Sequence, residues 1–168
     1  MTRTKLLEAT MAAIAENGDA AVRVQKIAES VGVREPSVYH FFKNREDLVE
    51  AAHVERYRRS HLEMVQPFQA GAALADDGED FRRIVKKILS LVYTAEREHI
   101  RSTRMSVLGA AQTSPTIAEA IRQINFEISS RLAEVFLTAQ EKNWIRKEVD
   151  PLAAAYWING QILGRVMA

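Results

Sequence analysis

A group of nine residues between positions 25 and 43 is rich in side chains that bind phosphate or contact the edges of bases. The group consists of Gln25, Lys26, Arg34, Glu35, Pro36, Ser37, Tyr39, His40 and Lys43. Basic side chains attract phosphates, and hydroxyl, amide and imidazole groups hydrogen-bond to a nucleic-acid backbone or to base edges. From Arg23 to Arg45 five basic residues stand against two acidic ones. The segment therefore favours contact with nucleic acid, although helical surfaces that dock proteins share this pattern.

Two short helices joined by a turn are expected to position this segment. The apolar residues of the first recur at helical spacing, at Val24, Ile27, Ala28 and Val31. Gly32 then interrupts the pattern. The second helix is expected to begin near Pro36, which a first helical turn tolerates, and to turn Val38 and Phe42 inward.

Longer helices are expected on either side of this pair. One covers about residues 4–16 and ends at Asn17-Gly18, and another begins at a cap formed by Asn44. Two short helices with a glycine-containing turn, braced in this way, are typical of a helix-turn-helix, whose second helix contacts bases in the major groove.

The remaining sequence also follows helical spacing. The segment from Pro67 to Asp80, with two glycines, is expected to be the main irregular connection. Further helices are expected over residues 81–92 and 100–111, from a cap at Ser114 to about residue 139, and from a cap at Asp150 to the end of the chain. The pattern predicts an all-α fold.

Composition and missing motifs narrow the classes of function. The net charge of +1 neither favours nor excludes binding to nucleic acid. The absence of cysteine excludes disulfides and thiolate chemistry, and it suits a reducing cytoplasm. Charges interrupt every long apolar stretch and the N-terminus lacks a signal-peptide core, so we expect a cytoplasmic protein without a membrane segment. The motifs of nucleotide binding, serine hydrolysis and zinc proteolysis are missing. We expect neither enzyme activity nor a cofactor or metal.

The run VQKIAESVGVREPSVYHFFKNREDL, from Val24 to Leu48, resembles the N-terminal domain of tetracycline-repressor (TetR) family transcriptional regulators. The residues that match the family pattern are Ile27, Ala28, Gly32, Val33, Ser37, Val38, Tyr39, His40, Phe41, Phe42, Arg45, Glu46 and Leu48. The resemblance covers about residues 3–55 and continues beyond them only as a helix layout. It implies a three-helix DNA-binding domain over residues 1–46 and a helical ligand-binding and dimerisation bundle over residues 47–168. The fourth helix would link the two, and the last helix of the family is expected to be absent.

The resemblance also implies roles for single residues. Residues 34–37, Tyr39 and His40 would lie at or near the major groove, with Tyr39 and His40 mostly on phosphate. Lys43, the first amides of the fourth helix, Gln25 and Lys26 would bind phosphate as well.

Two positions depart from the family pattern. Many relatives have a hydroxyl near Val22 and Arg23 that caps the second helix and touches phosphate, and here Arg23 could replace it by its charge. Glu35 occupies a position where relatives carry Lys or a small residue. Its carboxylate would either accept a hydrogen bond from cytosine N4 or serve the helix dipole.

The bundle is expected to hold a ligand pocket. Its candidate residues are Met64, Phe68, Tyr93, Arg101, Arg104, Met105, Leu108, Phe126, Tyr156 and Gln161, and for each of them core packing or a solvated face is the alternative. Arg101 and Arg104 share a helical face and would favour an anionic ligand if they turned inward, whereas exposure is the default for arginine. Gly160 and Gly164 are expected at a dimer interface, with contact inside the chain as the alternative.

We therefore expect a homodimeric, sequence-specific transcriptional regulator, a repressor that an unknown small-molecule effector releases from a palindromic operator in double-stranded DNA. The alternative is a helical small-molecule-binding or protein-interaction protein with a vestigial helix-turn-helix.

Overall fold

The computed structural model, which describes residues 2–92 and 94–164, consists of helices joined by short connections. The N-terminal part contains α1 (Thr2–Asn17), the 3-10 turn η1 (Asp19–Ala21), α2 (Val24–Val31) and α3 (Glu35–Val38). The rest contains α4 (Arg45–Ala73), α5 (Gly78–Val92), η2 (Ala95–Arg97), α6 (Glu98–Ala111), α7 (Pro115–Glu141) and α8 (Pro151–Gly164). The described residues form no strand, and the predicted all-α fold is confirmed.

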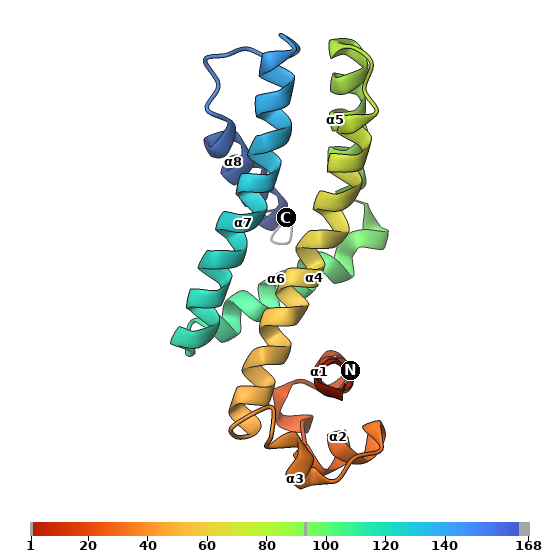
Figure 1. Ribbon diagram of the computed structural model, residues 1–168, viewed down its shortest axis with the longest axis vertical. Helices are drawn as coiled ribbons and strands as arrows, with labels where there is room; N and C mark the ends of the chain where they lie inside the picture. The colour runs from red at the N-terminus through yellow and green to blue at the C-terminus, as the bar shows by residue number, and fades with distance from the viewer. Residues whose placement is uncertain (1, 93, 165–168) are drawn as a thin grey trace.

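The molecule is elongated, and α4 runs through most of its length. Figure 1 shows α1, α2 and α3 gathered at one end, with α4 leading from them to α5. At the other end α7 and α8 form a second arm, and α6 passes between the arms. This arrangement separates the N-terminal helices from the larger bundle.

A first hydrophobic cluster forms where α1 packs across α2 and the first turns of α4. Leu6, Leu48 and Ala52 are fully buried at its centre, and Val38 and Phe42 are buried with them. The inward positions predicted for the short helices are thus confirmed. Because α3 has only four residues, this packing rather than its own helix propensity holds it in place.

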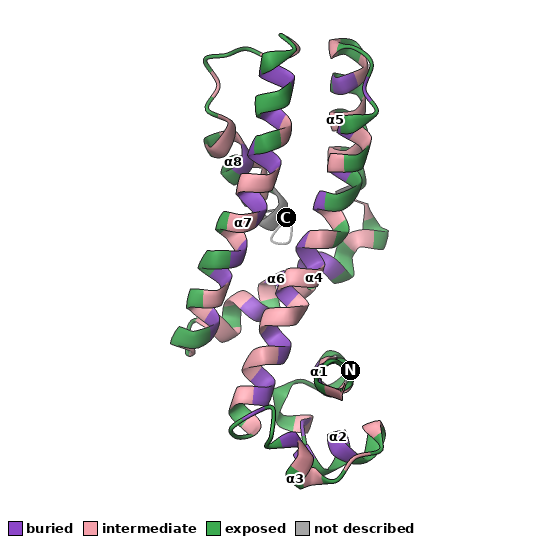
Figure 2. Ribbon diagram, in the orientation of Figure 1, coloured by how far each residue is buried: buried purple, intermediate pink, exposed green. Residues whose placement is uncertain are grey.

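A second cluster fills the bundle, where α7 packs against α4, α6 and α8. Its longest stripe is formed by Ile117, Ile121, Ile124 and Ile128 on α7. Figure 2 shows buried residues recurring along both α4 and α7. Helix α4 takes part in both clusters, with Leu48 in the first and Tyr57 in the second.

The prediction of an irregular connection from Pro67 to Asp80 was wrong, because α4 continues through Pro67 to Ala73. Proline cannot donate to the carbonyl four residues earlier, which would normally break the helix. That carbonyl, of Glu63, accepts a hydrogen bond from Arg97 Nη1 at 3.4 Å instead. Val65 and Phe68, buried on either side of the proline, hold the helix in the core.

Gly71, which contributed to the same prediction, lies inside α4 where α5 approaches closely. A Cβ atom at this position would stand 3.1 Å from a methyl group of Ile84. The connection between the two helices is therefore short and covers only residues 74–77.

The predicted helix starts are confirmed by their capping bonds. Ser114 Oγ accepts from the amide of Ile117 at 3.1 Å, and Asp150 Oδ1 accepts from the amide of Ala153 at 2.8 Å. These bonds satisfy amide groups that have no partner within their own helix. They fix the ends of α7 and α8.

Candidate functional site

The turn between α2 and α3 has the geometry that the sequence predicts. Gly32 has φ 76° and ψ 29°, the left-handed conformation that ends a helix without a steric penalty in glycine. The amides of Gly32 and Val33 donate back to the carbonyls of Glu29 and Ala28, each at 3.0 Å. Pro36 stands in the first turn of α3, as expected.

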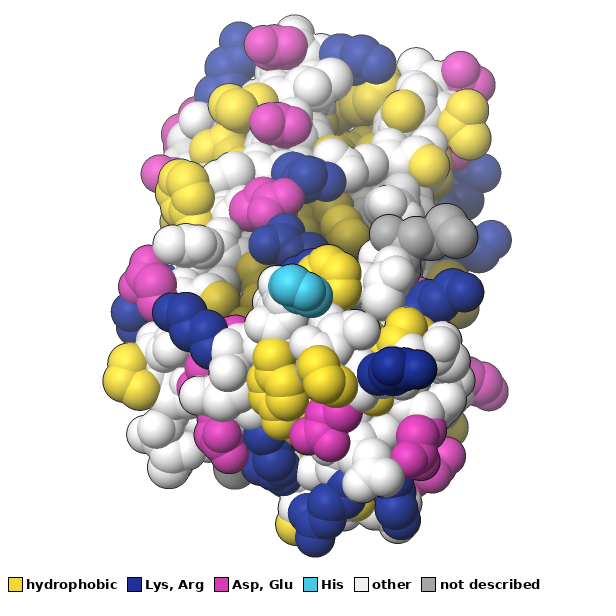
Figure 3. Space-filling view, turned by 60° about the horizontal axis from the view of Figure 1, so that its bottom comes forward, with side chains coloured by type: hydrophobic (Ala, Val, Ile, Leu, Met, Phe, Trp, Pro, Cys, Tyr) yellow, Lys and Arg dark blue, Asp and Glu magenta, His cyan; other side chains and the backbone are white. Residues whose placement is uncertain are grey.

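The nine residues predicted to contact nucleic acid lie on α2, in the turn before α3, on α3 or in the segment after it, and none is fully buried. Glu35 and Ser37 are half-buried and the other seven are exposed. In Figure 3, which brings this end of the molecule forward, Lys and Arg side chains stand at the lower edge beside acidic ones. The structure thus brings the predicted residues together on one accessible end of the molecule.

Tyr39 and Glu35 form a pair on this surface. The Tyr39 hydroxyl donates to Glu35 Oε1 at 3.0 Å, and this bond raises the pKa of Tyr39 above its usual value. Tyr39 follows the last residue of α3, so its ring is carried by the turn rather than by the helix. The Glu35 carboxylate has a partner within the chain and fixes the position of the Tyr39 hydroxyl.

The start of α4 is closed by two reciprocal side-chain bonds. Asn44 Oδ1 accepts from the Asp47 amide at 2.8 Å, and Asp47 Oδ2 accepts from the Lys43 amide at 2.8 Å. The first bond is that of an N-cap, and the second is similar to a capping box but reaches the amide one residue before the N-cap. The predicted cap is confirmed, and these two amides are already occupied by side chains of the chain itself. The Lys43 side chain is exposed beside them.

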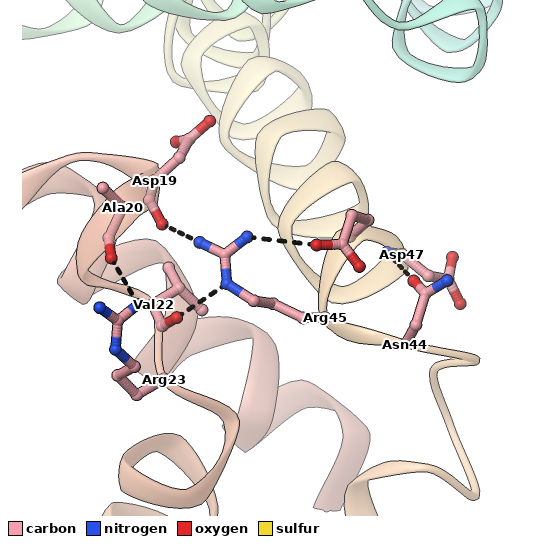
Figure 4. A network of polar contacts seen from close by, with 8 residues as sticks. Asp19, Ala20, Val22, Arg23, Asn44, Arg45 and Asp47 are labelled. Atoms are coloured by element: carbon pink, nitrogen blue, oxygen red, sulfur yellow. Dashed lines mark hydrogen bonds and ion pairs between the residues drawn. The ribbon is translucent and has the colours of Figure 1, made fainter.

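Arg45 connects α4 to the segment that precedes α2, as Figure 4 shows. Its Nε donates to the Val22 carbonyl at 2.9 Å and its Nη2 donates to the Asp19 carbonyl. His53, one of the buried residues of α4, also contacts Asp19, with 2.9 Å between Nε2 and Oδ1. Sequence reasoning identified Arg45 only as a match to the family pattern, because its two acceptors lie more than twenty residues away in the chain.

Arg23 does not cap α2. No side chain accepts from the first amides of this helix, and the Arg23 Nη1 donates to the Ala20 carbonyl at 2.8 Å. Figure 4 shows the guanidinium turned toward η1. The missing hydroxyl noted in the sequence therefore leaves the start of α2 without a side-chain cap.

Two of the cavities in the bundle share lining residues. The larger, of about 590 Å³, opens between α5, α7 and α8 and is almost entirely apolar, with Val85, Phe136 and Trp157 among its walls. The smaller, of about 30 Å³, is lined by residues of α4, α5, α6, α7 and α8. Leu89 and Ile158 line both cavities. Figure 3 shows hydrophobic side chains at the bottom of the hollow between the two arms.

Comparison with known proteins relates this geometry to a family. The model of the family described as "Bacterial regulatory proteins, tetR family" matches residues 6–52, which span the helix-turn-helix and its bracing helices. UidR of Escherichia coli K12, an HTH-type transcriptional regulator, is 23% identical over 149 residues, which cover 89% of this chain and 71% of UidR. The N-terminal residues 6–52 are therefore similar to the DNA-binding domain of tetR-family regulators.

Solved structures of TetR-type regulators extend the likeness to the whole fold. A protein from Rhodococcus sp. described as a TetR-family regulator has a TM-score of 0.72 at 22% identity, over 97% of this chain and 84% of that one. FadR of Bacillus subtilis, solved in complex with stearoyl-CoA, has a TM-score of 0.63 at 20% identity, over 98% and 85% of the two chains. The likeness to a DNA-binding regulator thus rests on residues 6–52, and the described chain as a whole shares the fold of these solved structures. None of the described helices is both long and apolar enough to span a bilayer.

The pocket residues expected from the sequence divide into three groups. Met64, Phe68 and Arg104 line the smaller cavity. Met105 and Leu108 are half-buried on α6, and Arg101 is buried, with its Nη1 donating to the Thr94 carbonyl at 3.0 Å. Phe126, Tyr156 and Gln161 are exposed, and Tyr93 lies outside the described residues. Both arginines are therefore buried, although exposure was the default expectation.

Cavity walls that the sequence did not single out come mainly from α5 and α8. Val85, Leu89 and Ile158 are examples, and nothing in their spacing marks them as lining a cavity. Of the two glycines expected at a dimer interface, Gly160 is exposed with open space around it. The surroundings of Gly164, in the last turn of α8, lie outside the described residues.

Proposed function

We propose that this regulator is a homodimeric repressor that binds a palindromic operator and is released from it by a small molecule in the bundle. The observation that carries the proposal is the double role of α4. Its first residues, Asn44 to His53, hold the helix-turn-helix through the bonds of Arg45 and His53 to Asp19. Further along the same helix, Met64 and Phe68 line the smaller cavity. A ligand that shifts this part of α4 would therefore also shift the DNA-binding surface.

For DNA contact we assign the nine residues predicted from the sequence. Arg34, Pro36 and Ser37, at the start of α3, would face base edges, and Lys43 would bind phosphate. Glu35 would accept from cytosine N4 after its bond to Tyr39 opens, which frees the tyrosine hydroxyl for phosphate. In a dimer two such helices would enter successive major grooves about 34–36 Å apart.

For the dimer we assign the exposed apolar face of α7 and α8. Phe126 and Leu137 stand eleven residues apart on one side of α7, and Tyr156 and Trp157 are exposed on α8. Exposed aromatic residues in a group are typical of protein interfaces. Gly160, with open space around its Cα, would allow a partner helix to approach closely.

For the effector we assign the two cavities. The larger one has the size of known small-molecule sites, which hold roughly 300–1,000 Å³. FadR of B. subtilis, which shares the fold, was solved with stearoyl-CoA. An effector bound more tightly to a conformation with misplaced recognition helices would weaken DNA binding, and DNA would weaken effector binding to the same degree.

The test is selection of bound sequences from random duplex DNA by the purified protein. We expect an inverted repeat to be enriched, and Lys43→Ala to weaken binding to that repeat. Lys87→Ala, an exposed lysine on α5 far from the helix-turn-helix, is the matched control and should bind like the wild type. A folded dimer that enriches no sequence at low salt would refute the regulator proposal and favour a vestigial helix-turn-helix.

A further inference from the structure

Arg104 is a buried charge without a counter-ion. Its side chain is 1% exposed, and no carboxylate of the described residues lies within ion-pair distance. Burial lowers the pKa of Arg104 to about 10, so the group stays charged at neutral pH. A buried charge that lacks an opposite charge is strongly unfavourable, and proteins normally pair it.

The hydrogen bonds of Arg104 all go to neutral groups on α4. Its Nη2 donates to the Ser60 carbonyl at 2.7 Å and to Met64 Sδ at 3.1 Å, and its Nε donates to Ser60 Oγ at 3.3 Å. The third nitrogen, Nη1, has no partner among the described residues, and Arg104 lines the smaller cavity. The guanidinium is thus held by α4 through Nε and Nη2, and the two N–H groups of Nη1 remain for a ligand.

A second donor stands at the same cavity. The Asn159 amide nitrogen donates one hydrogen to Ser129 Oγ at 3.0 Å and retains another. His61, also in the cavity wall, is neutral because burial and the Arg104 charge lower its pKa to about 3. Among the described lining residues Arg104 therefore carries the single formal charge, and it is positive.

The space beyond Arg104 is apolar. The smaller cavity shares Leu89 and Ile158 with the larger one, whose charged wall residues are Arg82 and Lys86. Among the residues that the structure describes, no acidic one lines either cavity. A ligand that fits both would combine a small anionic group with a hydrocarbon body.

We propose that the bundle binds an apolar monocarboxylate, with its carboxylate at Arg104 and Asn159 and its hydrocarbon part in the larger cavity. As an identification of the effector, the assignment rests on the proposed function. A volume of 30 Å³ is close to that of one or two water molecules, which suits the two oxygens of a planar carboxylate. Binding would supply the opposite charge that Arg104 lacks, and charge-assisted hydrogen bonds are the stronger kind.

The test compares decanoate, decanol, decyltrimethylammonium and butyrate by titration calorimetry on the full chain. We expect decanoate to bind the wild type at least about ten-fold more tightly than decanol, because a charge-assisted bond replaces a neutral one. Decyltrimethylammonium should not bind, since its cation would face Arg104. Butyrate has the carboxylate without a long apolar part and should bind far more weakly than decanoate.

Arg104→Met is the decisive variant, because its side chain fills a similar volume without charge. It should weaken decanoate binding by roughly 10- to 100-fold and leave decanol binding unchanged. Arg82→Met, at an exposed arginine beside the larger cavity, is the matched control and should stay within about three-fold of the wild type. Circular dichroism shows whether each variant is folded, and if Arg104→Met is not, the comparison of the four probes on the wild type decides.

Equal affinity of the wild type for decanoate and decanol, or full decanoate affinity in a folded Arg104→Met, would overturn the assignment. The selected operator gives an independent readout of the proposed function. Decanoate that binds through Arg104 and leaves the DNA complex intact would contradict the proposed release and leave the ligand assignment standing.

Discussion

The neutral state of His61 predicts a measurable dependence of stability on pH. The imidazole is buried against Tyr57, with 4.5 Å between the ring centres, and its Nδ1 donates to the Tyr57 carbonyl at 3.0 Å. Burial and the nearby charge of Arg104 lower the pKa of His61 to about 3 in the folded protein. In the unfolded chain the same group has its ordinary pKa of about 6.5. The unfolded state therefore binds more protons between these two values, and stability rises with pH across that window.

The size of the effect follows from this difference. Between about pH 7 and about pH 5 the unfolded chain gains most of one proton at this position, whereas the folded chain gains almost none. His61 should thus lower the free energy of unfolding by about 2 kcal/mol over this interval. His61→Phe removes the titrating group, and the Tyr57 carbonyl still accepts from Ser60 Oγ at 2.7 Å.

The assay is urea unfolding at both pH values, followed by tryptophan fluorescence at one protein concentration and in buffers without carboxylates. On acidification from pH 7 to pH 5, we expect the free energy of unfolding of His61→Phe to fall by about 2 kcal/mol less than that of the wild type. His99→Phe, at an exposed histidine, controls for the substitution itself. Equal losses in the wild type and His61→Phe would refute the reasoning, because His61 would then take up its proton in the folded state.

Four further substitutions are each measured by urea unfolding. Gly32→Ala should lower the free energy of unfolding by about 1 kcal/mol, because alanine is strained at φ 76° and nothing else crowds the site. Gly109→Ala, also in open space but inside α6, should raise it by roughly 0.5–1 kcal/mol, and equal effects at both glycines would contradict the conformational argument. Asn44→Ala removes the acceptor for the Asp47 amide and should cost about 1 kcal/mol, so an unchanged midpoint would show that the cap is dispensable. Gln140→Leu removes the bonds to two loop carbonyls at 2.9 and 2.8 Å and should cost about 1 kcal/mol, with faster amide exchange in residues 142–150 as a second readout.

The helix starts and the turn of the helix-turn-helix could be predicted because their chemistry is local. The side chains of Asn44, Ser114 and Asp150 each accept a hydrogen bond from an amide three residues later. Gly32 adopts the left-handed conformation that ends α2, which glycine reaches without strain. Such interactions depend only on residue types a few positions apart. The residues that we propose for DNA contact could be grouped for the same reason, since they lie within nineteen consecutive positions.

The irregular connection predicted at Pro67 was wrong because contacts with distant parts of the chain override the local signals there. A proline and two glycines are local signals for a loop, and the sequence was interpreted on those signals alone. The helix survives because Arg97, thirty-four residues after Glu63, supplies a donor to the carbonyl that the proline leaves open. Burial of the Phe68 side chain also stabilises this part of α4, and the local sequence pattern does not reveal that burial.

The sequence by itself determined the all-α class, the helix-turn-helix and the residues that it presents, because these follow from helical spacing, capping and one continuous motif. Only the tertiary structure decided which arginines are buried and what surrounds them. Arg101 and Arg104 share a face of α6, and Arg104 becomes a buried cation beside a cavity because α4 and α8 close over it. The same packing ties Arg45 to Asp19 and links the two ends of α4. Burial is set by contacts between helices far apart in the chain, and residue spacing within one helix does not contain that information.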